Sequence, residues 1–249
     1  MKVTSIQTAA IHAGEMKVIE FVDRYVPKLS DGSIVAISSK VVALCEGRVV
    51  KAGTQDVQKL AKDEAQYYLP PTAHSLGYTL TVNRNILVSK AGIDESNTGG
   101  HYVYWPADPQ ASANEIREFL VKKFAVRVGV ILTDGRITPM RRGVIGVGLS
   151  HSGFSALRNY VGSADIFGDY DLKYTYSSIL DGLAAAAVVQ MGEGDQRTPI
   201  AIVEDADFVT FQDRNPTDEE LSMLAMPMEE DIYAEMLKAI PWEKRPGKS

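Results

Sequence analysis

Acidic side chains follow three apolar stretches of the chain, and residues of this type suit the binding of hard metal ions. The three segments are Asp94-Glu95-Ser96-Asn97, Thr133-Asp134-Gly135-Arg136 and Met191-Gly192-Glu193-Gly194-Asp195. Carboxylate oxygens are the ligands that Mg²⁺ and Mn²⁺ prefer, with phosphates and water completing the shell. The alternative is that each segment is only a turn, because Asp and Asn side chains cap their own backbone.

Sequence motifs for common nucleotide-binding folds and for nucleophilic catalysis are absent or weak. The sequence contains no Walker motif and no GxGxxG after a predicted strand. Ser150-His151-Ser152 contains a nucleophile and a base, but neighbouring residues of a strand point to opposite faces. Arg141-Arg142 precedes the glycine-rich stretch 143–148, and it is either a phosphate or carboxylate ligand or a solvated basic pair. Tyr102, Tyr104 and Trp105 form an aromatic cluster, which favours a core or a dimer interface.

Composition limits the class of protein. The 249 residues carry a net charge of -6, which argues against a general nucleic-acid binder, since such proteins need a basic face. No stretch approaches the roughly 20 apolar residues of a membrane-spanning helix, and the first ten residues do not resemble a signal peptide. The single cysteine, Cys45, permits no intramolecular disulfide. We therefore expect a cytoplasmic protein with no membrane partner.

The elements that must position the acidic segments follow from hydrophobic periodicity. We expect helices over 16–25, 57–68, 112–124 (with Ser112 as N-cap) and 176–191, and a helical tail over 218–240 that is interrupted near Pro227. We expect strands over 33–42, 126–133, 144–149 and 199–204, a hairpin of 79–82 with 85–89, and pairing of 48–50 back across the Glu46-Gly47 turn. Strands and helices are mixed without a strict βαβ rhythm, which predicts an α+β fold. Residues 1–215 form the predicted catalytic domain, and 216–249 form a tail packed on it.

Several landmarks in order resemble the coenzyme F420-0:L-glutamate γ-ligase family, from about Gly32 to Val209. They are Glu46-Gly47-Arg48-Val49-Val50, Ala91 to Asn97, Pro106-Ala107-Asp108-Pro109, Thr133-Asp134, Pro139 with Arg141 and Gly143 to Gly148, Asp181 to Ala186, and Met191-Gly192-Glu193 before Pro199. One such landmark is weak evidence. The whole series in the right order is hard to obtain by chance.

The resemblance implies both a fold and a reaction. Members of the family look like intertwined α+β homodimers that use GTP, two divalent cations (Mg²⁺ or Mn²⁺) and a monovalent cation such as K⁺. The nucleotide would phosphorylate the terminal carboxylate of an F420-0-like acceptor, and the amine of L-glutamate would attack the acyl phosphate. Positioning and charge screening would supply the catalysis.

The resemblance also implies roles for individual residues. Asp94 and Asp134 match metal ligands and form, with Arg141, the predicted catalytic set, and Glu193 matches a ligand of the second metal. The residues expected to contact the nucleotide are Ser39, Lys40, Asn97, Met191, Gly192, Gly194 and Thr198.

Alternatives remain for the substrate and for activity itself. A folate-like acceptor also presents an extended acidic tail, and ATP is the alternative to GTP as the phosphate donor. Gly135 stands where the family usually has a hydroxyl residue, and Leu44 stands where it usually has a lysine. These two departures motivate a third reading, a nucleotide-binding homologue without catalysis.

Overall fold

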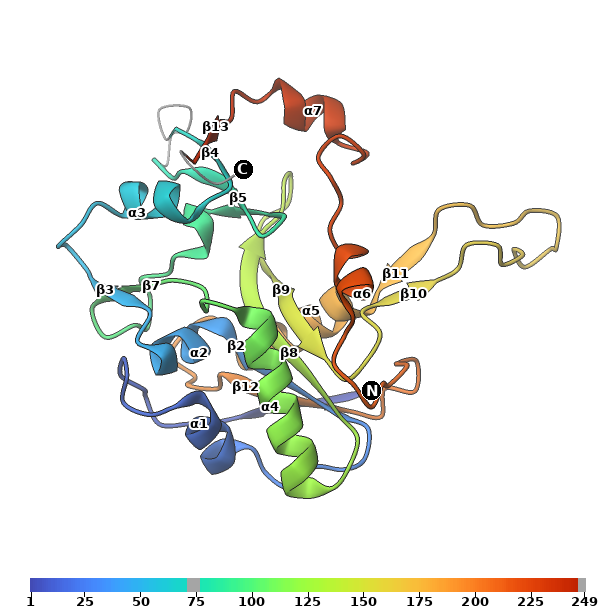
Figure 1. Ribbon diagram of the computed structural model, residues 1–249, viewed down its shortest axis with the longest axis horizontal. Coiled ribbons are helices and arrows are strands. Elements are labelled where there is room, and N and C mark those ends of the chain that lie inside the picture. Colours follow the sequence, from blue (N-terminus) through green and yellow to red (C-terminus); the bar gives the residue numbers. More distant parts are fainter. Residues whose placement is uncertain (71–76, 246–249) are drawn as a thin grey trace.

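A five-stranded mixed sheet forms the centre of the computed structural model, which describes residues 1–70 and 77–245 (Figure 1). The strand order is β1-β12-β2-β8-β9. The strands are β1 (Lys2–Ile6), β2 (Ser33–Ser38), β8 (Val128–Ile137), β9 (Val144–Ser152) and β12 (Ile200–Glu204). Only the β2–β8 pair among them is parallel in the described chain. The mixture of strand and helix confirms the predicted α+β class.

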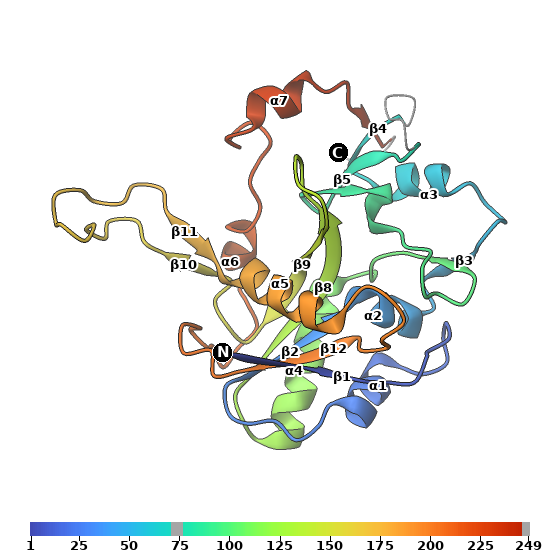
Figure 2. The ribbon, with the colours of Figure 1, turned by 180° about the vertical axis from the view of Figure 1, so that it is seen from behind.

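Helices cover both faces of this sheet. Val35 and Ile37 of β2 join one core with helices α1 (Val18–Tyr25), α2 (Ser39–Glu46) and α4 (Pro109–Phe124). Ile34 and Ala36 point the other way and join a second core with α5 (Ile179–Met191), which lies behind the sheet in Figure 1 and in front of it in Figure 2. Successive strand residues face opposite sides, so burial on both faces explains the uninterrupted apolar run in β2.

Close packing of α5 on β9 depends on two glycines. A Cβ atom at Gly146 would lie 2.4 Å from the backbone oxygen of Ala184, and one at Gly148 would lie 2.4 Å from Cγ of Leu180. The alanine-rich sequence of α5 supplies the small side chains on the facing surface. The helix therefore sits directly on the sheet, and its C-terminal end brings the segment after Met191 to a fixed place.

A second, smaller sheet carries the segment before Asp94. Its order is β13-β4-β5-β6, formed by β4 (Tyr67–Leu69), β5 (Leu80–Asn83), β6 (Ile86–Ser89) and β13 (Glu243–Lys244). The predicted hairpin of 79–82 with 85–89 is confirmed as β5 and β6, and its turn residues Arg84 and Asn85 both have positive φ. Helix α3 (Val57–Glu64) packs nearby, and β3 (Val49–Lys51) pairs with β7 (His101–Val103).

Two predictions around residue 40 are wrong. The strand expected over 33–42 ends at Ser38, and residues 39–46 form α2, which Gly47 closes in the left-handed conformation. The β-branched Val41 and Val42 resemble a strand, but burial of five successive residues of this short helix overrides that local preference. Val49 and Val50, within β3, pair with β7 instead of folding back across the Glu46-Gly47 turn.

Other boundaries also differ from the predictions. Helix α4 begins at Pro109 with Asp108 as its N-cap, because the Asp108 carboxylate accepts from the Ala111 N–H. Ser112 lies inside the first turn. The helix expected over 57–68 ends at Glu64, the one expected over 176–191 begins at Ile179 after the short strand β11 (Tyr176–Ser178), and the strand expected to end at Thr133 continues to Ile137.

The C-terminal part and one long hairpin leave the compact body. The tail expected to be helical over 218–240 contains only α6 (Asp218–Ser222) and α7 (Ala234–Ala239), since Pro227 and exposed polar residues separate two short turns. Close to the last described residue, the tail forms β13, which pairs with β4. Strands β10 (Leu157–Asn159) and β11 form the base of an arm that projects from the body in Figures 1 and 2.

Among residues 1–70 and 77–245, we find no helix whose length and apolar character would let it cross a membrane.

His151 on β9 generates a prediction about acid stability. Its imidazole is 1% exposed and packs edge-on against Phe154, and burial lowers its pKa to about 4. Between pH 6.5 and 4 the unfolded chain takes up a proton that the folded chain refuses, so stability falls as the pH falls through this window. We expect a loss of about 3 kcal/mol across it.

Thermal unfolding at pH 8 and at pH 4.5 measures this effect. The fall in Tm between the two pH values should be smaller for His151→Phe than for the unchanged protein, whereas the control His12→Gln, at an exposed histidine, should behave like the unchanged protein. Equal falls in His151→Phe and the unchanged protein would contradict the assignment.

Candidate active site

One cavity of ≈ 600 Å³ brings together most of the residues that the sequence singles out. It is lined by Lys40, Asp94, Asn97, Asp134, Met191, Gly192, Glu193, Gly194 and Thr198, among others. These residues come from α2, from the segment after β6, from β8 and from the loop after α5. The three acidic segments therefore do converge, although Asp134 lies within a strand and not in a loop.

Asp94 is held by the turn that it begins. Its Oδ1 accepts from the backbone N–H groups of Glu95 and Ser96 at 2.7 and 3.0 Å. Its Oδ2 lies 2.6 Å from Nζ of Lys40, which also donates to the Ser96 carbonyl. Burial alone would raise the pKa of Asp94, but the Lys40 ammonium and the hydrogen bonds of Ser96 bring it below its usual value. The carboxylate therefore stays ionised and faces the cavity.

Asp134 lies on β8, just beyond an irregularity in the pairing with β9 between Leu132 and Thr133. The indole N–H of Trp105 donates to its Oδ2, and the Gly135 N–H donates to its Oδ1 at 2.8 Å. Burial raises the pKa of the Asp134 carboxyl to about 6. Asp134 is therefore harder to ionise than Asp94, and a cation bound beside it would favour its ionised form by lowering its pKa.

The loop after α5 forms another wall of the cavity and carries Glu193. The side-chain amide of Asn97 donates to the Gly194 carbonyl at 2.9 Å, which joins this loop to the Asp94 segment. Inside the loop, the Thr198 hydroxyl donates to the Met191 carbonyl. The backbone N–H of Thr8 donates to the Arg197 carbonyl, so residues 8–12 close the cavity on another side.

Two predicted site residues lie elsewhere. Ser39 is buried at the start of α2, next to the lining residues Ser38 and Lys40, so it faces the cavity at most with its backbone. Arg141 lies at the exposed turn between β8 and β9, which holds the fully exposed Met140. It is separated from the cavity because the two long strands carry the turn away from the sheet. Arg141 is not among the residues that line the cavity, so the structure does not support the prediction that it shares a site with Asp94 and Asp134.

Trp105 is the functional contact that the sequence reasoning missed. Its place in an aromatic cluster with Tyr102 and Tyr104 favours a core or interface position, and Trp105 is indeed only 4% exposed. A buried indole N–H requires an acceptor, and here the acceptor is a carboxylate of the predicted site. From the sequence, burial of Trp105 indicates that its N–H needs an acceptor, but the sequence does not identify which residue supplies that acceptor.

Lys40 is the cation that this structure places among the acidic groups. Its charge acts on Asp134 and Glu193 as well as on Asp94. Within the described ranges, no three His, Cys, Asp or Glu side chains are gathered closely enough to hold a metal ion as they stand. A metal ion bound at Asp94 would therefore require the ammonium to leave Oδ2.

A sequence profile described as F420-0:Gamma-glutamyl ligase matches residues 5–205. The chain belongs to this family. The coenzyme F420:L-glutamate ligase of Methanocaldococcus jannaschii is 29% identical, over 94% of this chain and 96% of that protein. The protein of the same name from Methanococcus maripaludis strain C7 is 31% identical over 94% and 97%, and that of Haloarcula marismortui is 34% identical over 72% and 78%.

The family assignment and the cavity support each other. The matched range contains Asp94, Asp134 and Glu193, together with every other cavity-lining residue named above. The matched range ends before the tail, so α6, α7 and β13 lie outside the family profile.

The ion pair of Lys40 with Asp94 can be tested through stability. Without the ammonium, the carboxylates repel one another, so we expect Lys40→Met to lower Tm in EDTA by about 2 °C, which corresponds to roughly 1 kcal/mol or less for a partly exposed pair. Millimolar MnCl₂ should restore the Tm, because the divalent cation replaces the lost charge. The control is Lys51→Met, at an exposed lysine outside the cavity. Equal Tm values in EDTA for both variants would contradict this role of Lys40.

Proposed function

We propose that this protein is a GTP-dependent ligase that joins L-glutamate to the carboxylate of an F420-0-type acceptor through a γ-glutamyl amide bond. One observation carries the proposal. In a chain of the F420-0:γ-glutamyl ligase family, Asp94, Asp134 and Glu193 line one cavity together with Lys40. Acidic ligands around a cavity of this size suit a metal-dependent nucleotide reaction.

The donor set fits divalent cations. Asp94, Asp134 and Glu193 offer oxygen ligands of the type that Mg²⁺ and Mn²⁺ require, and Lys40 already places a positive charge at Asp94. We assign Asp94 and Asp134 to the first cation and Glu193 to the second, with a monovalent cation such as K⁺ assisting. Bound cations would screen the triphosphate and stabilise charge on the transferred phosphoryl group.

The start of α2 suits the phosphates of the nucleotide. Its N-cap, Ser38, makes no side-chain capping bond within the described part of the chain, so the Ser38 hydroxyl does not compete with an anion for the first N–H groups of the helix. Ser39 would contribute through its backbone, and Lys40 through its ammonium once it leaves Asp94. Asn97 and the loop 191–198 would form the other wall of the nucleotide site.

The reaction proceeds in two transfers. An oxygen of the acceptor carboxylate attacks the γ-phosphorus of GTP, which forms an acyl phosphate and releases GDP. The unprotonated amine of L-glutamate then attacks the acyl carbon, the bond to the phosphate oxygen breaks, and the amide forms with loss of one proton and release of phosphate. The protein residues act by positioning the reactants and excluding water.

A mass-spectrometric assay tests this function. Purified protein is supplied with MnCl₂, L-glutamate, GTP or ATP, and an F420-0-type or a folate-type acceptor. We expect the mass of one added glutamate on the F420-0-type acceptor with GTP. Addition to folate alone would overturn the proposed acceptor, and the absence of both product and released phosphate would overturn the ligase assignment.

Asp134→Asn tests the role of the site within that assay. Mutation of a residue that only hydrogen-bonds a metal ligand typically lowers metal affinity or activity by about 10- to 100-fold. Removal of the ligand's own charge should therefore lower the rate by at least about 100-fold. The control Asp207→Asn removes an exposed acid outside the cavity and should leave the rate unchanged. A fully active Asp134→Asn variant would contradict the assignment of this carboxylate.

The protein is further proposed to act as a homodimer, with the β10–β11 arm as the contact. Figures 1 and 2 show the arm extending from the body. The exposed fractions of Ile166, Phe167 and Tyr174 are 92%, 78% and 87%. A two-stranded hairpin is marginally stable alone, and clustered exposed apolar side chains mark interaction sites. The family resemblance favours a second copy of the chain as the partner that covers these side chains.

Light scattering after size-exclusion chromatography measures the mass in solution. We expect the mass of two chains for the unchanged protein and of one chain for the Ile166→Asp, Phe167→Asp double variant, because buried charge would oppose association. The control Tyr78→Asp, at an exposed aromatic outside the arm, should remain dimeric. A double variant with the mass of two chains would contradict the role of the arm.

A further inference from the structure

The indole of Trp105 contacts Asp134 directly and also contacts the backbone that leads to Asp94. Its N–H donates to Oδ2 of Asp134, and its ring lies against the backbone of Gly92, two residues before Asp94. A Cβ atom at Gly92 would lie only 2.2 Å from Cε2 of the ring. This close approach is possible because residue 92 has no side chain.

The backbone before Asp94 adopts an unusual conformation that creates this contact. Lys90, Ala91 and Gly92 all have positive φ, at 49°, 54° and 81°. Such values are unfavourable for residues with a side chain, and they persist where surrounding contacts hold them. Here the Thr81 hydroxyl accepts from the Ala91 N–H, and the Asn83 amide donates to the Ala91 carbonyl, both at 2.9 Å. The turn is therefore fixed by the small sheet.

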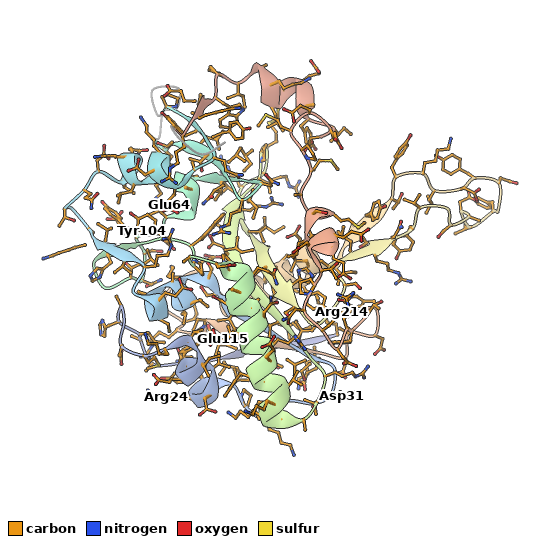
Figure 3. The ribbon with its side chains drawn as sticks, in the orientation of Figure 1. Arg24, Asp31, Glu64, Tyr104, Glu115 and Arg214 are labelled. Carbon is orange, nitrogen blue, oxygen red and sulfur yellow. The ribbon has the colours of Figure 1, made fainter. Side chains whose placement is uncertain are left out.

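A second link joins the same two positions through the backbone. Asp94 and Val103 exchange two hydrogen bonds of 2.9 Å, and Trp105 follows Val103 by two residues. Arg48 then fastens Trp105 from the other side, since its Nε donates to the Trp105 carbonyl at 2.6 Å and its Nη2 to Glu64 at 2.6 Å. The Arg48 guanidinium also lies over the ring of Tyr104, and Figure 3 shows Glu64 and Tyr104 close together beside α3.

We infer that Trp105 is a positioning residue that sets the separation and orientation of the Asp94 and Asp134 carboxylates for cation binding. This inference rests on the proposed metal-dependent function. A carboxylate has about four acceptor sites, and the bonds from Trp105 and Gly135 use two of those on Asp134. The remaining lone pairs are held toward the cavity, while the same indole supports the turn that carries Asp94.

Mn²⁺ binding, measured as free Mn²⁺ by electron paramagnetic resonance, tests this role apart from turnover. Partners of metal ligands are worth 10- to 100-fold in affinity, so we expect Trp105→Phe to weaken Mn²⁺ binding by at least about tenfold. Gly92→Ala should have a similar effect, because the added methyl group displaces the ring. The matched control is Trp242→Phe, whose indole donates to the Leu237 carbonyl far along the tail, and its affinity should be unchanged.

Fluorescence provides a readout that a purely structural role would not affect. The chain has two tryptophans, so Trp242→Phe leaves Trp105 as the only one. We expect Mn²⁺ to quench its emission, and we expect Asp134→Asn to abolish the quenching. Replacement of Trp105 by β-(3-benzothienyl)alanine in the Trp242→Phe protein keeps the ring but removes the N–H, and Mn²⁺ affinity should still fall.

The outcomes separate this inference from the proposed function. Unchanged Mn²⁺ affinity in folded Trp105→Phe or, if that variant does not fold, in the benzothienylalanine protein would overturn the positioning role while glutamate ligation by the unchanged protein persisted. Failure of the unchanged protein to bind Mn²⁺ or to add glutamate would instead overturn the proposed function.

Discussion

The parallel pairing of β2 with β8 determines where the cavity forms. Its register aligns Ser38 with Thr133, so Lys40 and Asp134 follow at the same edge of the sheet. Parallel strands end at one edge, and the crevice beyond their carboxyl ends is the usual place for ligands in open sheets. Strand β12 runs antiparallel to β2 and begins with Ile200 beside Ile37, so the loop 191–199 arrives at that edge too. Backbone hydrogen bonds, and not attraction between side chains, therefore bring like charges together.

This arrangement has an electrostatic consequence. Carboxylates forced into one partly desolvated cavity oppose one another's ionisation, and burial raises the pKa of Asp134 to about 6. Lys40 offsets part of this repulsion through its 2.6 Å contact with Asp94. The donors on the protein are ordered before any ligand arrives, because Trp105, Ser96 and Gly135 hold both carboxylates. Cation binding at Asp94 would then require the Lys40 ammonium to leave, while the two carboxylates keep their positions, and preorganised charged groups of this kind favour electrostatic stabilisation.

Local patterns predicted some of these features and could not predict others. The sequence predicts the hairpin of 79–82 with 85–89 before Asp94, because that pattern is contained in a few neighbouring residues, and β5 and β6 confirm it. The start of α2 was missed, since Val41 and Val42 have the local character of a strand and only their burial among other elements selects the helix. The family resemblance, and not periodicity, related Asp94 to Asp134 and Glu193.

Contacts between distant segments are the part that periodicity does not contain. Trp105 and Asp134 are 29 residues apart, and Asn97 and Gly194 are 97 apart. A pattern of apolar residues says that Trp105 is buried, but the acceptor of its N–H depends on how two sheets are placed together. Arg141 illustrates the reverse case, because its neighbours in sequence resemble a site while the length of β8 and β9 carries it into solvent.

Gly135 bears on the proposed second cation site at Glu193. A Cβ atom at residue 135 would lie 2.6 Å from Cγ1 of Val144, so a hydroxyl-bearing side chain would require that valine to move. The same Cβ position is 3.5 Å from Oε1 of Glu193. The Glu193 carboxylate therefore lies beside the position that a side chain at residue 135 would occupy. Although residue 135 has no hydroxyl, the Glu193 carboxylate supplies oxygen donors on that wall, and this placement favours the proposed ligase over a homologue without catalysis.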